Sequence, residues 1–328
     1  MRQKHVMTSA RLHYFFIASC LAATAAVAKV PPEFEQAWNL ISTFDGSGNA
    51  IEVAQRMAQD LGSEFPTAGY RQVLEAHYIA TWQLQDEDRP SALHQRALDL
   101  ASHALALNAG LVQGYVVRAR ALLMSSNPQA AASAADRALQ LEPESPDAII
   151  VRADIARRTG DFTAAAAWYR QFIQVAPNDV RKSNGYFHLA KTYTLDSYAS
   201  SAERTALLAA AGSSYDSMVQ LDPQAPWKLS NYAGFLNNEG EDFEAAEQYA
   251  QRALKIREFR MARMQLALAR YQKVWRSMMV MTDKALASAV AGVEGTTAVS
   301  LSEALNSGPG GDGVRMRLGL LLDRVSRQ

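Results

Sequence analysis

The sequence of 328 residues has little of what marks several protein classes. Its one cysteine, Cys20, lies near the N-terminus, so the rest of the chain has no disulfide, no thiolate nucleophile and no cysteine metal site. The apolar run at residues 14–28 is shorter than the roughly 20 residues that a membrane-spanning helix needs. With 48% hydrophobic and 20% charged residues, the chain is nevertheless typical of folded, soluble protein.

An excess of positive charge is also missing. The 33 Lys and Arg residues balance 33 Asp and Glu residues, and removal of the first 28 residues would leave a small acidic excess. Binding to nucleic acid without sequence preference requires many Lys and Arg side chains that face phosphates. We therefore expect no nucleic-acid partner.

Motifs that carry chemistry are absent as well. The segment DGSGN at residues 45–49 lacks the glycine and the glutamate of a calcium loop, and GPGGDG at residues 308–313 lacks the Lys-Ser/Thr of a phosphate loop. There is no G-x-S-x-G elbow and no H-E-x-x-H pair, and we interpret the histidines as surface or groove residues. The sequence predicts no catalytic residue, no cofactor and no metal, and thus a protein that is not an enzyme.

The N-terminus has the pattern of an export signal. Arg2, Lys4 and Arg11 precede the apolar run, which ends in the small-residue cleavage pattern Ala-Val-Ala at residues 26–28. This favours a signal peptide at residues 1–28, cleaved near Ala28.

Two alternatives remain for this segment. The stretch IASC at residues 17–20 is similar to a lipobox, in which Cys20 would be acylated and the protein would become an outer-membrane lipoprotein. Against this, the apolar run continues beyond Cys20. An uncleaved signal anchor is the other alternative, and these two are the only membrane attachments that we expect. Each possibility indicates an exported protein of the periplasm or cell envelope.

A repeat accounts for the middle of the chain. Pro143 and Pro177 are 34 residues apart, which is the period of a helix–turn–helix unit, and they place units at residues 112–145 and 146–179. Small and apolar residues in each unit recur at spacings of three and four, which puts them on one helix face. Each proline ends the second helix of its unit because it lacks an N–H group.

Two stretches resemble the tetratricopeptide repeat. RRTGDFTAAAAWYRQFIQVAPND at residues 157–179 has a Gly-Asp-aromatic turn, a second helix rich in small residues and a closing proline. YAGFLNNEGEDFEAAEQYAQRALKI at residues 232–256 has the same order of features. The resemblance implies an all-α, tetratricopeptide-like helix–turn–helix solenoid of about six repeats with C-terminal capping helices.

The second of these stretches belongs to a unit near residues 227–258, and weaker copies complete the predicted domain at residues 29–258. They place further units near residues 35–66, where Trp38 takes the family's tryptophan position, and near residues 69–111 and 183–225. Two units carry extra residues, near 84–93 and 195–205. Beyond them we expect capping helices at residues 259–293, a linker at residues 294–313 and an amphipathic helix at residues 314–328.

The resemblance also implies a concave groove that binds a peptide segment of a partner protein. Arg120, Arg157 and Lys191 would pair with its carboxylates, and asparagines would hold its backbone. In the alternative, Asp154 simply neutralises Arg157. The predicted groove residues are Val116, Arg120, Ile150, Arg157, Phe187, Lys191, Asn231, Phe235 and Asn238.

Together these patterns predict a non-catalytic scaffold or adaptor for protein–protein interaction in a bacterial cell envelope. The partner is a protein or peptide that the sequence does not identify. The alternative is an accessory or regulatory subunit of an envelope enzyme or of a secretion or assembly apparatus.

Overall fold

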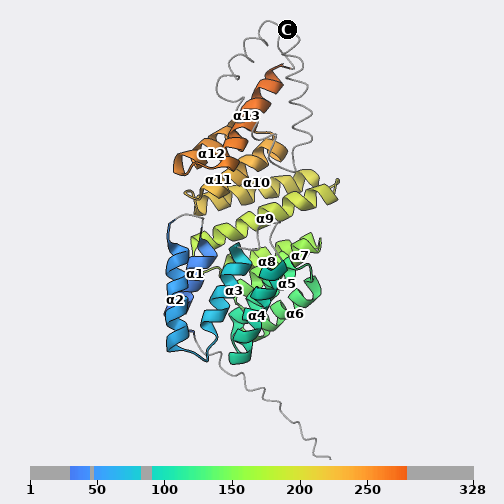
Figure 1. Cartoon of the computed structure of the whole chain (residues 1–328). Helices are drawn as coiled ribbons and strands as arrows, with labels where there is room; N and C mark the ends of the chain where they lie inside the picture. Colours follow the sequence, from blue (N-terminus) through green and yellow to red (C-terminus); the bar gives the residue numbers. More distant parts are fainter. Residues whose placement is uncertain (1–29, 45–47, 83–90, 279–328) are drawn as a thin grey trace, which may run out of the picture.

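The computed structural model describes residues 30–44, 48–82 and 91–278. Within these residues all regular structure is helical (Figure 1). The helices are α1 (Pro32–Thr43), α2 (Ala50–Glu64), α3 (Tyr70–Trp82), α4 (Ser91–Leu107), α5 (Val112–Met124), α6 (Pro128–Leu141), α7 (Pro146–Arg158), α8 (Phe162–Val175), α9 (Asp179–Ala199), α10 (Arg204–Leu221), α11 (Pro226–Phe235), the π-helical turn η2 (Leu236–Gly240), α12 (Phe243–Ile256) and α13 (Arg260–Met278).

The helices pack as a chain of helix pairs. Helices α1 and α2 form the first pair, and each following pair continues in sequence order up to α11 and α12, which gives six pairs in the described part. In the first four pairs the first helix also packs on the first helix of the next pair, as α1 on α3, α3 on α5 and α5 on α7. Helix α13 packs on α11 and α12 as a cap. This confirms the predicted all-α solenoid of about six repeats with a capping helix.

In three of the helix pairs, the turn between the two helices contains the same type of N-terminal helix cap. Asn127, Asp161 and Asp242 precede α6, α8 and α12, and each side chain accepts a hydrogen bond from the backbone N–H three residues later, at 3.2, 3.0 and 3.0 Å. These bonds satisfy one of the free N–H groups at each helix start. The sequence motif that we identified as a turn therefore acts as a helix cap.

Two hydrophobic cores meet on helix α9. One core extends from Phe34 in α1 to Leu189 in α9, and the other from Ala190 in α9 to Ala269 in α13. Figure 1 shows the yellow-green pair α9 and α10 lying across the molecule, between α1–α8 on one side and α11–α13 on the other. Helix α9 therefore contributes residues to both hydrophobic cores.

The fifth pair is longer than the fourth. Helix α9 has 21 residues and α10 has 18, whereas α7 and α8 have 13 and 14. The sequence predicts the extra residues near 195–205, and most of them extend helices, since only residues 200–203 lie between α9 and α10. Helix α9 also begins four residues before the predicted unit start at 183, because the Asn178 side chain caps it by accepting from the N–H of Arg181 at 2.9 Å.

Several predicted segments lie outside the described residues: the signal peptide with Cys20, the linker at 294–313 and the helix at 314–328. Of the predicted capping segment, α13 covers residues 260–278. Among the described helices, none combines the length and the apolar character that crossing a membrane would take.

Candidate functional site

A cavity of about 260 Å³ opens on the face formed by the first helices of the pairs. We call this face the inner face and the cavity the inner-face cavity. Side chains from α1, α3, α5, α7 and α9 line it: Ser42, Ala80, Thr81, Arg120, Leu123, Met124, Ile150, Asp154, Arg157, Arg158, Arg181, Asn184 and His188. Five helices from five different units therefore contribute to one site.

Three of the predicted groove residues meet at this cavity: Arg120, Ile150 and Arg157. Two predicted apolar anchors lie elsewhere, since Val116 is fully buried in the first core and Phe235 is buried in the second. In this structure neither of those two side chains is available at the surface. Whether the residues at the cavity bind a peptide stays a prediction.

The other predicted groove residues lie along α9 and α11. The Lys191 ammonium sits 5.6 Å from the centre of the Phe187 ring, which in turn contacts Trp227 edge-on at 5.0 Å. Asn231 donates its side-chain N–H to the carbonyl of Trp227 at 2.8 Å, and Asn238 is exposed in η2. These residues do not line the inner-face cavity.

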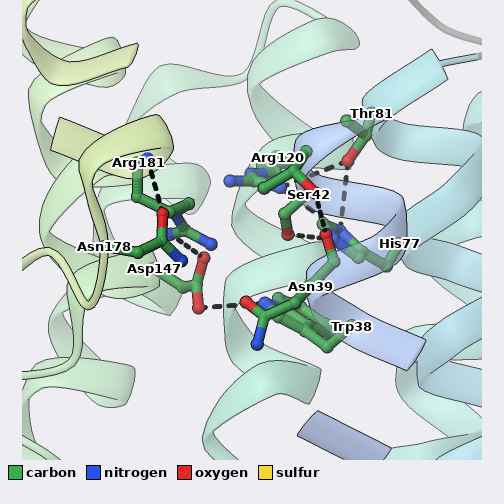
Figure 2. A network of polar contacts seen from close by, with 10 residues as sticks. Trp38, Asn39, Ser42, His77, Thr81, Arg120, Asp147, Asn178 and Arg181 are labelled. Atoms are coloured by element: carbon green, nitrogen blue, oxygen red, sulfur yellow. Dashed lines mark hydrogen bonds and ion pairs between the residues drawn. The ribbon is translucent and has the colours of Figure 1, made fainter. Parts of the chain in front are cut away.

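One polar cluster ties α1, α7 and α9 together. Asp147, at the start of α7, accepts from the indole N–H of Trp38 at 2.9 Å and from the Arg181 guanidinium at 2.6 Å (Figure 2). Burial alone would raise the pKa of Asp147, but Arg181, Arg120 and the two hydrogen bonds hold it below its ordinary value. Asp147 is therefore a carboxylate that neutralises a buried arginine.

A second cluster surrounds His77, which is fully buried although the sequence indicated a surface or groove position. Its ring stacks on Trp38 at 3.7 Å between centroids, its Nε2 lies 2.9 Å from the Ser42 hydroxyl, and its Nδ1 lies 3.2 Å from Arg120 (Figure 2). An arginine can only donate, so Nδ1 accepts and Nε2 carries the proton that it donates to Ser42. Burial and then the charge of Arg120 lower the pKa of His77 well below its usual range, which keeps the ring neutral.

A third cluster neutralises Arg157. Its Nε donates to the Tyr169 hydroxyl at 3.1 Å, that hydroxyl donates to Asp154 at 2.5 Å, and the Arg157 and Asp154 side chains form an ion pair at 3.5 Å. The structure therefore contains the ion pair between Asp154 and Arg157 that the sequence analysis named as the alternative. His188 stacks on Tyr169, and burial lowers its pKa to about 4, so the ring is neutral at pH 7.

Two arginines at the cavity form no ion pair in the described part of the chain. Arg120 donates hydrogen bonds to His77 and Thr81, and the carboxylates of Asp147 and Asp154 act on its charge only at longer range. The one polar contact of the exposed Arg158 is to the sulfur of Met124 at 3.3 Å. The carboxylates near the cavity are engaged by Arg157 and Arg181. The inner-face cavity therefore carries a local excess of positive charge.

A larger cavity of about 380 Å³ lies between α2, α3 and α4. Its charged side chains include Glu75 and Arg96, which form an ion pair with each other. Arg71 also lines that cavity and leaves an excess of one positive charge there, against two at the inner-face cavity, so the inner-face cavity is the stronger candidate. No group of three or more potential metal ligands occurs among the described residues.

Sequence reasoning missed the contributions of Trp38, His77, Arg181 and His188 to this site. Trp38 was identified only as a family packing position, yet its indole N–H reaches a residue 109 positions away. The one available signal was the occurrence of polar residues on the first helices of the units. The contacts of these four residues depend on how successive helix pairs are oriented relative to one another, which the sequence pattern does not give.

Comparisons with known proteins agree with this fold. Residues 116–180 match the tetratricopeptide repeat family, and no curated protein matches the sequence. A structure of a human IFIT1 dimer with PPP-AAAA is 14% identical and has a TM-score of 0.57, covering 84% of this chain and 61% of that chain. The Cut9–Hcn1 hetero-tetramer structure of the APC/C is 14% identical with a TM-score of 0.50, covering 75% of this chain and 45% of that chain.

A third similar structure is TTC0263, a thermophilic TPR protein in Thermus thermophilus. It is 17% identical with a TM-score of 0.47, covering 62% of this chain and 97% of that chain. Identities this low inform on the fold alone. The class that the fold defines is a tetratricopeptide-like α-solenoid, a class that generally mediates protein–protein interaction.

Proposed function

We propose that the protein is a non-catalytic scaffold or adaptor of the bacterial cell envelope that binds an acidic segment of a partner protein on its inner face. The observation that carries this proposal is the pair of arginines at the inner-face cavity, Arg120 and Arg158, which form no ion pair within the described residues. Arg120 is partly buried, and a cation held there without a paired anion is costly, so a partner carboxylate would reduce that cost. Arg158 is exposed and adds a second positive charge at the mouth of the cavity.

The fold supports the choice of a protein partner. Solenoids of stacked helix pairs present an extended surface, and tetratricopeptide-like folds generally act in protein–protein recognition. Beside the cavity, Phe187 and Lys191 on α9 could extend the contact with an apolar ring and a further cation. The envelope location rests on the export signal at residues 1–28.

The test is co-purification from the envelope fraction with two matched variants. Arg120→Gln with Arg158→Gln removes the unpaired cations at the cavity. Arg118→Gln with Arg137→Gln removes two exposed arginines on α5 and α6 that do not line it. We expect the first pair to weaken capture of the partner about tenfold or more, with a modest dependence on salt, and the second pair to leave it unchanged. Equal behaviour of both pairs would contradict the proposal.

A further inference from the structure

Hydrogen-bond donors from several helices face the inner-face cavity. Arg120 projects from α5 and Arg158 from the end of α7. Asn184 on α9 makes no side-chain hydrogen bond within the described residues, and its Oδ1 is buried, so its amide can offer only N–H groups to a ligand. Arg120 and Arg158 each use only Nη1 in the contacts described above, so three helices present N–H groups that remain available to a ligand.

Helix α1 adds a fourth donor. The Ser42 hydroxyl oxygen accepts a hydrogen bond from the N–H of His77 Nε2, and its own O–H has no acceptor among the described residues. Ser42 also lines the cavity. His77 and Trp38 therefore act as positioning residues, since the stacked ring orients both Ser42 and Arg120.

The charge of the site limits what it can take. Arg157 and Arg181 are paired with Asp154 and Asp147, and two arginine charges remain. A ligand that matches them carries up to two negative charges and accepts hydrogen bonds from several directions. A carboxylate has one charge and two oxygens in one plane, whereas a phosphoryl group carries −1.5 to −2 charges at pH 7 and three strong acceptor oxygens in a tetrahedral arrangement.

We propose that the inner-face cavity binds a phosphoryl group, either as free phosphate or as a phosphate monoester. Its oxygens accept from the free donors of four helices: Ser42, Arg120, Arg158 and Asn184. The volume of about 260 Å³ is below the range typical of pockets for drug-sized ligands, and it suits such a group with a small substituent. This inference goes beyond the proposed function, because it concerns the same cavity but a ligand other than an acidic protein segment.

Calorimetric titration of the purified exported protein tests the inference with three probes: inorganic phosphate, glycerol phosphate and acetate. We expect phosphate or its ester to bind with one-to-one stoichiometry and at least about tenfold more tightly than acetate. If inorganic phosphate binds more tightly than glycerol phosphate, the ligand is the free ion; if glycerol phosphate binds more tightly, the ligand is a phosphate monoester. Absence of phosphate binding, or acetate binding as tightly as phosphate, would overturn the inference.

Variants make the test specific to the site. Arg158→Gln alters an exposed side chain and Arg120→Gln a half-buried one, and each should weaken phosphate binding about tenfold or more. Arg118→Gln, two residues away on the same helix and exposed, should bind as the unaltered protein does. A loss of the same size in Arg118→Gln would overturn the inference.

The two proposals fail in different ways. If phosphate does not bind while the Arg120 and Arg158 variants still lose the partner protein, the cavity recognises carboxylates and only the phosphoryl inference falls. If phosphate binds with the expected arginine dependence while partner capture is unaffected, the proposed acidic-segment function falls and the phosphoryl site stands.

Discussion

The two core regions contain different chemistry. In α1–α8 the first helices of the pairs present polar clusters around Asp147, His77 and Asp154, with a cavity among them. In α10–α12 aromatic rings pack between the first and second helices, where Tyr232 of α11 stacks on Tyr215 of α10 at 5.2 Å and makes a tilted contact with Tyr249 of α12 at 4.6 Å. One repeat architecture thus supports a polar site in one region and an aromatic core in the other.

A buried ion pair nevertheless occurs in each region. Arg181 pairs with Asp147 at 2.6 Å, and Lys228 pairs with Asp222 at 2.7 Å. Both cations are almost fully buried, with 5% and 1% of the side chain exposed. The two cations differ in one respect, since a buried lysine can release its proton and an arginine cannot.

The largest expected effect comes from removing the two carboxylates. Asp147→Ala leaves Arg181 charged and buried and also frees the indole N–H of Trp38, so we expect a loss of roughly 3–5 kcal/mol in the free energy of unfolding. Asp222→Ala should cost less, roughly 1–3 kcal/mol, because Lys228 keeps its bond to the Ser183 hydroxyl and burial already lowers its pKa.

Chemical denaturation of both variants measures this difference. Asp136→Ala is the control, since Asp136 forms a more exposed ion pair with Arg152 and should cost at most about 1 kcal/mol. If Asp222→Ala destabilises the protein as much as Asp147→Ala, the distinction between the two cations is wrong.

Acid should weaken the first region, because the two histidines with a lowered pKa, the buried His77 and the partly buried His188, pack there. Burial keeps the pKa of His188 near 4 and that of His77 well below its ordinary value of 6.5, and the sequence has no histidine after His188. Between pH 6.5 and about 4 the unfolded chain binds protons that the folded chain does not. Stability is therefore complete above about pH 6.5 and falls as the pH decreases to 4.

His77→Gln should reduce this slope. The variant removes one buried group that must stay neutral, while a glutamine oxygen can still accept from Arg120. Over this pH interval we therefore expect a smaller loss of unfolding free energy in His77→Gln than in the unaltered protein. The exposed His103 provides the matched variant, and His103→Gln should leave the slope as it is. A slope unchanged in His77→Gln would mean that His77 does not stay neutral in the folded state.

The repeat was predictable from sequence because its signals are local. The 34-residue spacing of Pro143 and Pro177 and the turn residues before α8 and α12 predict the helix pairs, and the structure confirms an array of such pairs. The contact of Trp38 with Asp147 was not predictable, since it joins the first and fourth pairs across the inner face. Arg120 was placed at the groove from its position in the unit, but its lack of a carboxylate depends on neighbours from other units.

The smallest expected effect concerns the residue before each helix cap. Gly160 has φ +82°, in the left-handed region, and Ser126 and Glu241 occupy the corresponding positions with φ +59° and +50°. A side chain is strained in that conformation, whereas glycine adopts it freely. Ser126→Gly should therefore raise the free energy of unfolding by up to about 1 kcal/mol, although the greater freedom of glycine in the unfolded chain offsets part of the gain.

Glu241→Gly should gain less than Ser126→Gly, because it also removes the ion pair between Glu241 and Arg276, which is exposed and worth roughly 0–1 kcal/mol. The reverse change at the regular position, Gly160→Ala, should cost about 1 kcal/mol, since nothing lies within 4 Å of the added methyl group and backbone strain is the only penalty. Denaturation midpoints at equal m-values measure all three. A loss of stability in Ser126→Gly would show that the Ser126 side chain contributes more than its backbone strain costs, and the equivalence of the three turns would then be wrong.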